Sequence, residues 1–289
     1  MILAEKNEEY LLDRCTICVL TYNRSDQLTL TITNLVNEFI NDNIKIIVVN
    51  NGSTDDTRNN LKELKRVFDK LEIIDSFENL GCARGREVAW RIATTEYILS
   101  MDDDIRISRN GLLCMLQTLS ANNRTGLVSP IIIDAISLVA LNPVDCNNSF
   151  EKSFYEACFL FKRIMLSDVG YLDPALTIAG EGLDYSIRMR KLDYLIKRDP
   201  DVKVMHFDRI RDLKTLTARN VKWLESFCYV YWKNFTPPLA LIYSLRRFLG
   251  HLRVDLFSFR LLTGLTLLNA VILGSKNGRK ARVVRKHKE

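Results

Sequence analysis

The sequence has no apolar run long enough to cross a membrane. A spanning helix needs about 20 consecutive apolar residues. The most apolar segment, residues 256–274, contains Arg260, and the uninterrupted run after it has about 13 residues. Residues 1–14 are polar and acidic, so we expect no secretory signal there. Both absences argue against an integral membrane protein and against a secreted one.

The cysteines lack the pattern of a disulfide framework or of a zinc site. The chain has seven of them, an odd number, at scattered positions. Cys15 and Cys18 form a C-x-x-C in an apolar, strand-like run with no second pair, which disfavours zinc and thioredoxin-type redox chemistry. We therefore expect reduced thiols in a cytosolic compartment.

The excess positive charge is confined to the C-terminal end of the chain. The sequence has 41 Lys and Arg against 35 Asp and Glu, a net charge of +6. Residues 276–289 hold seven of the basic residues and one acid, so the rest of the chain has 34 of each sign. A neutral body with a basic tail indicates either an anionic surface as partner or a solvated terminus. Nucleic acid is not an expected partner, because no aromatic stacking platform accompanies the tail.

Strand-like and helix-like patterns alternate through the first half of the chain. Short, mostly apolar segments predict strands at 16–20, 45–49, 71–74 and 97–101, and helical spacing is found at 27–39 and 87–93. This alternation predicts an α/β fold with a doubly wound, mainly parallel sheet. In the less regular second half we expect strands at 125–133, 153–161 and 202–205, and helices at 163–169, at 181–191 and, broken at Pro237-Pro238, from 213 onward.

Polar residues follow three of the four expected parallel strands. They are Thr21–Arg24, Asn50–Thr54 and Asp102–Asp104. Ligands of such sheets bind beyond the carboxyl ends of the strands, so we expect these clusters to converge on one ligand. The Ser-Thr pair at 53–54 is also expected to cap the next helix, with the Asp pair at 55–56 in its first turn.

The run Asp102-Asp103-Asp104 is the strongest chemical signal in the sequence. Adjacent carboxylates repel each other by roughly 1 kcal/mol per close pair even in water. Their hard oxygens suit Mg²⁺ or Mn²⁺, which also bind diphosphate oxygens. The alternative is a solvated acidic turn, but the position after a buried strand favours a metal site.

Six short motifs occur in a fixed order between residues 16 and 206, some two thirds of the chain. They are Thr-Tyr-Asn-Arg (21–24), Val-Val-Asn-Asn-Gly-Ser-Thr-Asp-Asp-Thr (48–57), Asn-Leu-Gly-Cys-Ala-Arg-Gly-Arg (79–86), Tyr-Ile-Leu-Ser-Met-Asp-Asp-Asp (97–104), Gly-Glu-Gly-Leu-Asp-Tyr-Ser-Ile-Arg (180–188) and Pro-Asp-Val-Lys-Val-Met-His (200–206). By their order and spacing the chain resembles the family 2 glycosyltransferases of the glycosyltransferase A-type (GT-A) fold.

The resemblance implies a binding site for a nucleoside-diphosphate sugar. Its residues would be Thr21, Tyr22, Asn23, Arg24, Asn50, Asn79, Gly81, Arg84, Arg86, Asp102 and Asp103. Mn²⁺ or Mg²⁺ would be held by Asp104 and His206, with a structural role as the alternative for this lone histidine. Asn50 stands where the family usually has an acid that accepts a hydrogen bond from the base, and an amide can accept or donate. The identity of the base therefore stays open. For Arg84 and Arg86, a solvated helix face is the alternative.

The catalytic base is expected at a helix start. An inverting transfer needs a carboxylate that takes the proton from the acceptor hydroxyl. Where the family usually has a Glu-Asp pair, this chain has Glu181-Gly182. Glu181 is the preferred catalytic residue, and Asp184 is the second candidate. Both acids could instead only favour the helix N-terminus, in which case the protein would be an inactive homologue.

The resemblance also suggests how the chain is organised. Residues 1–210 would form the catalytic domain, with a nucleotide-sugar-binding half at 15–104 and an acceptor-binding half at 105–210. Residues 211–275 mix Leu, aromatic and basic residues. Together with the basic tail at 276–289 they suit helices lying in the headgroup layer of an anionic membrane. The alternative is a pair of helices packed on the catalytic domain or on a second subunit of a homo-oligomer.

These features favour an inverting hexosyl- or deoxyhexosyltransferase that builds a bacterial-type surface polysaccharide, with rhamnosyl transfer as the commonest look-alike. It would act at the cytoplasmic face of the cell membrane on a glycan or lipid-linked glycan acceptor. An inactive partner that binds nucleotide sugars is the second hypothesis, because the aspartate expected at Gly182 is absent. A nucleotidyltransferase is the third. It is disfavoured because the first strand is followed by Thr-Tyr-Asn-Arg, not by a Gly-rich basic loop.

Overall fold

The computed structural model describes residues 2–142, 152–207, 213–257 and 264–286. The chain divides into two compact units. One, the sheet unit, comprises Met1–Pro174 and Tyr185–Asp208, and the other, the helical unit, comprises Ala175–Asp184 and Arg209–Glu289.

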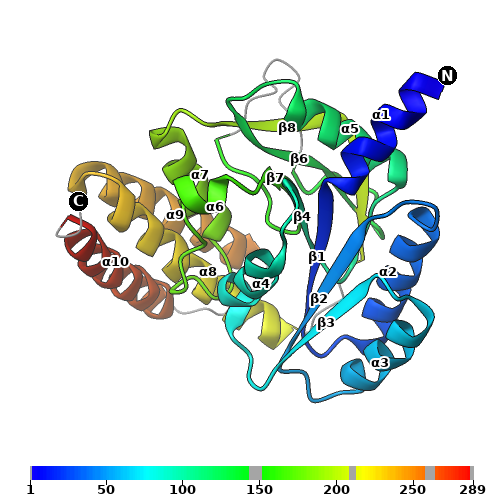
Figure 1. The fold of residues 1–289 in the computed structure, drawn as a ribbon. Helices are drawn as coiled ribbons and strands as arrows, with labels where there is room; N and C mark the ends of the chain where they lie inside the picture. The colour runs from blue at the N-terminus through cyan, green and yellow to red at the C-terminus, as the bar shows by residue number, and fades with distance from the viewer. Residues whose placement is uncertain (1, 143–151, 208–212, 258–263, 287–289) are drawn as a thin grey trace. The chain divides into compact units, whose positions relative to one another are not determined.

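The described residues of the sheet unit form an eight-stranded sheet in the order β3-β2-β1-β4-β7-β6-β8-β5 (Figure 1). Its parallel half consists of β1 (Cys15–Thr21), β2 (Lys45–Asn51), β3 (Leu71–Ser76) and β4 (Tyr97–Asp102). In the other half, β7 (Cys158–Lys162) runs antiparallel to β4 and β6 (Thr125–Asp134), β6 is parallel to β8 (Leu195–His206), and β5 (Ile105–Arg106) is antiparallel to β8. The expected α/β fold with a mainly parallel sheet is confirmed.

The central strands are buried on both faces, which explains their continuous apolar sequences. In β1, Cys15, Ile17 and Val19 join one core cluster, and Cys18 joins the other. Helices α1 (Ile2–Asp13), α2 (Ser25–Glu38), α3 (Thr57–Val67) and α5 (Arg109–Ser120) contribute to the first cluster. Helices α4 (Gly81–Ile92), α6 (Met165–Asp168) and α7 (Glu181–Lys191) contribute to the second. The Cys15 and Cys18 thiols therefore point into opposite cores.

The start of α3 differs from the expectation. Neither residue of the Ser-Thr pair caps this helix, because its first residue is Thr57 and its N-cap residue is Asp56. Asp55 precedes the helix and accepts hydrogen bonds from the Thr57 amide (3.1 Å) and the Ser25 amide (3.1 Å). Asp55 thus links the starts of α2 and α3, and neither aspartate lies in the first turn of α3. The expected strand at 153–161 is also shorter, since regular pairing starts only at Cys158.

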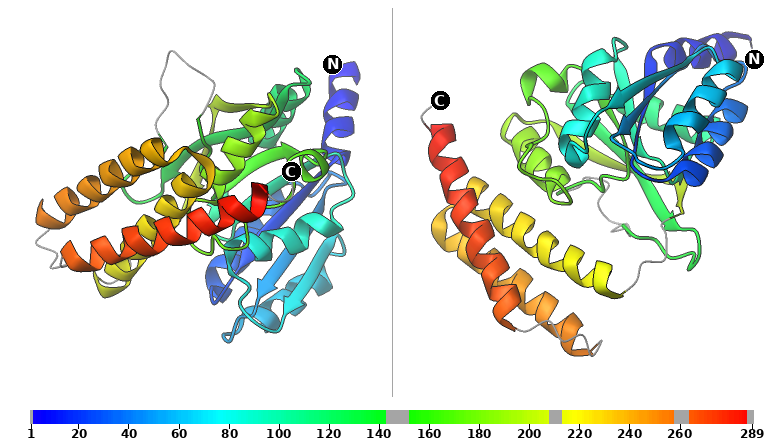
Figure 2. Two further views of the ribbon diagram at one scale, coloured as in Figure 1. Left: turned by 90° about the vertical axis from the view of Figure 1, so that its left-hand side faces the viewer. Right: turned by 90° about the horizontal axis from the view of Figure 1, so that it is seen from below.

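Three helices make up most of the helical unit, α8 (Leu213–Asn234), α9 (Pro237–Phe257) and α10 (Gly264–Lys286), and Figure 2 shows them lying side by side. Helices α8 and α10 approach most closely at two glycines of α10. A Cβ atom added at Gly274 would lie 2.1 Å from the backbone oxygen of Glu225, and one at Gly278 would lie 2.3 Å from that of Tyr229. The G-x-x-x-G spacing thus lets two backbones meet where any side chain would separate them.

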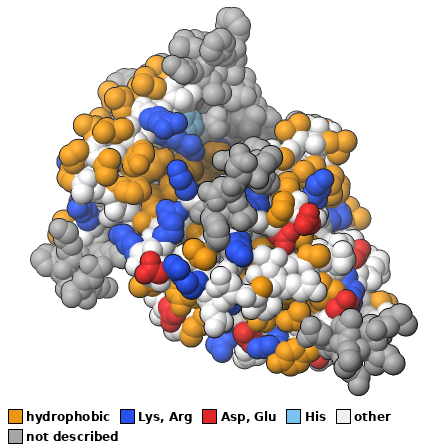
Figure 3. All heavy atoms as spheres, turned by 90° about the horizontal axis from the view of Figure 1, so that it is seen from above, with side chains coloured by type: hydrophobic (Ala, Val, Ile, Leu, Met, Phe, Trp, Pro, Cys, Tyr) orange, Lys and Arg blue, Asp and Glu red, His pale blue; other side chains and the backbone are white. Residues whose placement is uncertain are grey.

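Helices α9 and α10 expose apolar side chains. The large ones are Leu239, Leu241, Ile242, Leu245 and Leu249 of α9 and Leu268, Ile272 and Leu273 of α10. Figure 3 shows hydrophobic side chains gathered among Lys and Arg side chains on the left of the face that it draws. Within the described residues, no helix combines the length and the apolar character that a membrane span requires.

Candidate active site at the carboxyl ends of the strands

The loops after β1 and β2 are joined by Asn23. Its backbone amide donates to Oγ of Ser53 (3.0 Å), and its Oδ1 accepts from the amide of Thr54 (2.7 Å). Asn23 adopts a φ of 52°, a left-handed conformation that Asn tolerates better than most residues. Beside it, Tyr22 is 44% exposed, so an aromatic ring stands at the surface of the loop.

The three aspartates at the end of β4 are divided between two arginines. Arg86 of α4 donates to Oδ1 of Asp102 at 2.6 Å. Arg24 donates to Oδ1 of Asp103 at 3.0 Å and also to Oδ2 of Asp104. Asp103 and Asp104 are each 2% exposed, so Arg24 binds two carboxyl groups that the fold has removed from water.

Burial and neighbouring charges give Asp103 and Asp104 different acidities. Burial raises the pKa of Asp103 to about 7, against the opposing effects of Arg24 and of a hydrogen bond from Thr21 (2.6 Å). Burial also acts on Asp104, but a hydrogen bond from His206 and the charge of Arg24 outweigh it and hold the pKa of Asp104 at about 2. Asp104 is therefore an anionic oxygen donor at any physiological pH.

Strand pairing brings His206 to Asp104. His206 ends β8 opposite Ile105, and the amide of Phe207 donates to the carbonyl of Asp104 at 2.8 Å. Nε2 of His206 lies 3.3 Å from Oδ1 of Asp104. A cation that binds an oxygen and a nitrogen at adjacent octahedral positions, each about 2.1 Å away, holds them about 3 Å apart. The pair thus fits two ligand positions of one Mn²⁺ or Mg²⁺ ion.

The protein supplies only part of such a coordination shell. Within the described ranges, no three His, Cys, Asp or Glu side chains converge closely enough to hold a metal ion by themselves. Mg²⁺ and Mn²⁺ are commonly bound by one or two protein ligands, with water and phosphate oxygens completing the shell. The donor set therefore suits a cation that is shared with a phosphate-bearing ligand.

The ends of β2 and β3 are locked together by amide side chains. Asn51 donates to Oδ1 of Asn79 (3.1 Å) and accepts from the amide of Leu80 (2.9 Å), while Oδ1 of Asn79 also accepts from the amide of Gly81 (2.8 Å). Gly52 has a φ of 75°, and a Cβ atom there would lie 2.4 Å from the carbonyl carbon of Glu78. This close approach makes one rigid rim from two loops.

Arg84 and Arg86 lie in different environments. Both lie in α4, but Arg84 is exposed to solvent and Arg86 is 4% exposed and bound to Asp102. Gly81, with a φ of 77°, begins this helix. Arg86 is thus part of the aspartate cluster, whereas Arg84 is held by the helix at its surface.

Glu181 and Asp184 begin α7 and belong to the helical unit. Glu181 is 2% exposed. Asp184 is fully buried, and its Oδ1 accepts from Nζ of Lys233 (2.8 Å) and from Nδ2 of Asn234 (2.8 Å). Two donors from α8 therefore hold Asp184 in place within this unit.

Asp75 lies beside Asn50, although the sequence motifs do not single it out. It lies in β3, one strand over from Asn50, and accepts a hydrogen bond from Nδ2 of Asn50 at 2.7 Å. The sequence contains a signal for it, because Asp75 directly follows the expected strand at 71–74 just as the other polar clusters follow their strands.

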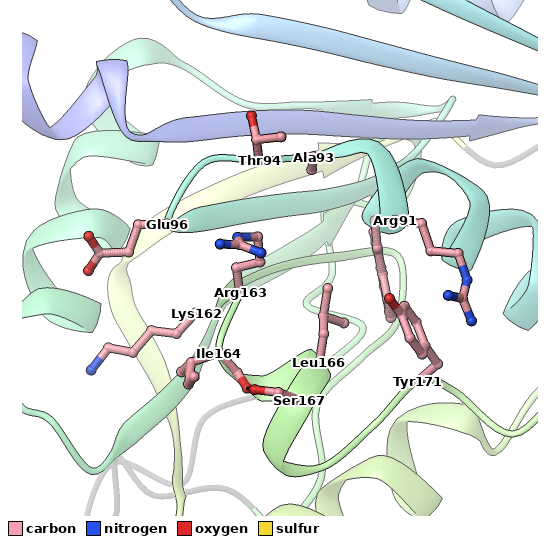
Figure 4. A pocket seen from close by; sticks show the side chains of 11 residues that line it. Arg91, Ala93, Thr94, Glu96, Lys162, Arg163, Ile164, Leu166, Ser167 and Tyr171 are labelled. Carbon is pink, nitrogen blue, oxygen red and sulfur yellow. Dashed lines mark hydrogen bonds between the residues drawn. The ribbon is translucent and has the colours of Figure 1, made fainter.

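A cavity of about 880 Å³ lies at the opposite edge of the sheet. Its walls come from the end of α4, the residues before β4 and the segment after β7. Figure 4 shows Arg163 pointing into it, with Glu96 and Lys162 on one side and Arg91 and Tyr171 on the other. Because these residues precede β4 or follow an antiparallel strand, this cavity is separate from the strand-end cluster.

Comparisons with known proteins point to one family. Residues 16–163 match the family model described as "Glycosyl transferase family 2". The chain is 22% identical over 253 residues to a poly-β-1,6-N-acetyl-D-glucosamine synthase of Staphylococcus epidermidis, covering 82% of this chain and 60% of the synthase. It is 30% identical over 121 residues to a teichoic acid poly(glycerol phosphate) polymerase of the same species, covering 42% of this chain and 16% of the polymerase. The chain thus spans less than two thirds of the length of these relatives.

Two solved structures share the fold. A mannosyltransferase from Pyrobaculum calidifontis, solved with GDP-mannose and Mn²⁺, superposes with a TM-score of 0.63 at 18% identity and covers 98% of this chain and 93% of its own. GalNAc-T7, solved with UDP, GalNAc and Mn²⁺, gives a TM-score of 0.59 at 13% identity and covers 75% of this chain and 47% of its own. At these identities the likeness concerns the fold alone.

Proposed function

This chain belongs to glycosyl transferase family 2, and from that premise we propose that it transfers a sugar, with inversion, from a nucleoside-diphosphate donor to a glycan or lipid-linked glycan of a surface polysaccharide. One observation carries the proposal. Arg24, Asp103, Asp104 and His206, from three separate segments, meet at the carboxyl ends of the strands. That is the edge where α/β sheets of this kind bind ligands.

The nucleotide-sugar donor would be bound by acidic, basic and aromatic side chains. Asp104 and His206 would hold Mn²⁺ or Mg²⁺, which when bound neutralises charge on the diphosphate. Arg84, exposed in the first turns of α4, is placed to meet phosphate oxygens as a cation. Tyr22 offers an exposed ring against which a base can stack. Asp102 would accept hydrogen bonds from the ribose while Arg86 holds it.

Glu181 is the proposed catalytic base. It would take the proton of the acceptor hydroxyl as that oxygen attacks the anomeric carbon and the diphosphate leaves. Asp184 is the weaker candidate, because Lys233 and Asn234 occupy one of its oxygens. Because position 182 is glycine and not aspartate, there is a second candidate function. In that case the protein binds nucleotide sugar but does not catalyse its transfer.

We also propose that the helical unit binds to the anionic inner face of the cell membrane. The exposed apolar residues of α9 and α10 accompany basic residues at the surface of the same helices, among them Arg246, Lys276, Arg279 and Lys280. Apolar and basic side chains together suit the headgroup layer. Self-association through the same apolar face is the alternative.

The first test is a panel of UDP-, dTDP- and GDP-linked sugars with Mn²⁺ or Mg²⁺, measuring released nucleoside diphosphate. Wild type should release it from one donor only when the metal is present, and both Asp104→Ala and Glu181→Ala should lose at least about 100-fold in rate. Asp201→Ala, an exposed acid on the same strand as His206, serves as the matched control and should keep full activity.

The other outcomes separate the alternatives. Donor binding without release, whatever acceptor is supplied, would support the inactive partner and point to Gly182 as the reason. Release of pyrophosphate from a nucleoside triphosphate and a sugar phosphate would instead indicate a nucleotidyltransferase. Loss of activity in Asp201→Ala would mean that the aspartate effect is not local to the site.

A further inference from the structure

Asn50 and Asp75 form a hydrogen-bonded pair across two parallel strands. They are partners in the β2–β3 register, and Nδ2 of Asn50 donates to Oδ1 of Asp75 at 2.7 Å. Asn50 is 1% exposed, whereas the side chain of Asp75 is 36% exposed. The pair therefore presents a carboxylate to solvent from a buried amide support, on the strand next to the one where this family usually places its base-binding acid.

The orientation of the Asn50 amide is fixed from both ends. Its Oδ1 accepts from the backbone amide of Ser53 at 3.2 Å, and its Nδ2 donates to Asp75. A flipped amide would place two donors together at Ser53 and two acceptors together at Asp75, so only one orientation satisfies both contacts. One N–H of Asn50 is thus used by Asp75, and its second N–H remains as a donor.

Asp75 keeps one oxygen for a ligand. Oδ1 accepts from Asn50 and lies 3.4 Å from Nε of Arg58 in α3. In the part of the chain that the structure describes, no hydrogen bond to Oδ2 is found. The strand ends therefore offer an exposed acceptor, Oδ2 of Asp75, supported by the buried amide of Asn50.

We propose that Asp75 and Asn50 together recognise the nucleobase of the donor through an edge that carries an N–H beside a C=O. Uracil and thymine (N3–H beside O4) and guanine (N1–H beside O6) have such an edge. Adenine and cytosine present a bare ring nitrogen at that position, which would face the carboxylate lone pairs without a proton between them. This inference rests on the proposed function, because it assumes that a nucleoside diphosphate occupies these strand ends.

The pair thereby replaces the acid that is missing at position 50. A neutral amide alone would tolerate either kind of base edge, because it can donate or accept. Held by Ser53 and Asp75, the Asn50 amide can only donate its remaining N–H, so its ambiguity is removed. Asp75 is then a specificity-determining residue that sets which nucleotides are accepted, without touching the reacting atoms.

The test measures dissociation constants of UDP, dTDP, GDP, ADP and CDP for the full chain with Mn²⁺, for wild type and Asp75→Asn. Wild type should bind at least one of UDP, dTDP and GDP about tenfold or more tightly than ADP and CDP. Asp75→Asn should weaken that nucleotide by about ten- to a hundredfold, as expected for the loss of a hydrogen bond to a charged group. Its affinities for ADP and CDP should change by less than about threefold.

Glu72→Gln is the matched control, because Glu72 lies on the same strand, is 37% exposed and likewise pairs with a basic side chain, Lys45. It should leave all five constants unchanged. Binding of inorganic pyrophosphate with Mn²⁺ should be equal in wild type and Asp75→Asn, which shows that the variant keeps an intact phosphate site.

Failure of this inference can be told from failure of the proposed function. If wild type binds no nucleoside diphosphate, the proposed function itself is wrong. If wild type binds one selectively and Asp75→Asn keeps the same selectivity and affinity, the Asn50–Asp75 contact only joins two strands and the inference is overturned.

Discussion

At the scale of single residues, Arg24 is the cation on which the aspartate cluster depends. Its side chain is 16% exposed, and it bridges Asp103 and Asp104, whose side chains are 3% and 2% exposed. Removing one partner of a buried ion pair leaves charge without compensation, which costs far more than the pair itself contributes. Arg24 and a divalent metal would satisfy the same carboxylates, so the two cations should affect each other.

We expect Arg24→Ala to lower the free energy of unfolding by about 3 kcal/mol in EDTA, because two buried carboxylates lose their shared guanidinium. Saturating Mn²⁺ should restore more stability to this variant than it adds to wild type. Thermal unfolding with EDTA and with Mn²⁺ measures both effects. Arg163→Ala, an exposed arginine at the cavity on the opposite edge of the sheet, is the control. Equal Mn²⁺ shifts in wild type and Arg24→Ala would contradict the prediction.

Asp103 should make stability depend on pH in a defined direction. Burial raises its pKa to about 7, above the ordinary value of 3.8. The folded state therefore holds a proton that the unfolded state releases, and this group lowers stability as pH rises from about 4 to about 7. Asp103→Asn should remove that trend.

The measurement is the melting temperature of wild type and Asp103→Asn in EDTA from pH 4 to pH 8. The difference between them should move in favour of the variant up to about pH 7 and then level off. Parallel curves across this range would show that Asp103 is not protonated in the folded protein.

At the scale of helices and strands, the close contact between α8 and α10 depends on Gly274 and Gly278, which have no side chain. We expect Gly274→Ala to destabilise the protein by about 1–3 kcal/mol, since its Cβ would meet the backbone oxygen of Glu225 at 2.1 Å. Gly250→Ala is the matched control. Gly250 lies in α9 with nothing within 4 Å of an added Cβ, so alanine there should stabilise by up to about 1 kcal/mol.

Chemical denaturation of the two alanine variants provides the comparison. The variants carry the same substitution in neighbouring helices of one unit, so a general effect of alanine on helix propensity would move both in the same direction. Opposite signs are expected only if the backbone contact of α10 with α8 forms in solution.

The sequence locates the central strands of the sheet because they are buried along most of their length. Strands β1, β2 and β4 are predicted because both faces are covered and most of their residues are apolar. Helix α5 was not identified, although Ser108 caps it and its buried residues recur at helical spacing. Helix α3 was given the wrong cap, since the choice among adjacent polar residues depends on the loop after β1, where the Ser25 amide binds Asp55.

The sequence predicts which residues gather at the candidate site, but not which of them bind to one another. Polar residues at strand ends were expected to converge, and Asp103 and Asp104 do meet Arg24, which is 79 and 80 residues away along the chain. Which arginine would serve which aspartate follows from the strand order, and no local pattern contains that order. Asp75 follows its strand as the other polar clusters do, but its contact with Asn50 depends on the β2–β3 register, which the sequence does not show.

At the scale of the whole molecule, charge and apolar exposure are unevenly distributed. The excess positive charge lies at the end of the sequence, and α9 exposes apolar side chains beside Arg246. We expect the protein to co-sediment with vesicles of anionic phospholipid and not with neutral vesicles, and the binding to weaken as salt is raised.

A pair of apolar-to-charged variants tests this surface. Leu241→Glu with Ile242→Glu, at residues 59% and 58% exposed, should abolish vesicle binding. Leu30→Glu, at an equally exposed residue (57%) of α2, should leave it intact. If the α9 variant binds vesicles like wild type but loses a concentration-dependent increase in mass, the apolar face serves self-association and not the membrane.

The close packing of backbone around Gly52 limits the mutations that its codon can tolerate. An added Cβ would collide with the backbone of the neighbouring loop, and the φ of 75° already disfavours any other residue. Every missense change of a glycine codon introduces a side chain, so this codon can drift only through synonymous changes. Among natural copies of the gene, a missense mutation at Gly52 should mark those that have begun to decay, even where the aspartates of the site are still intact.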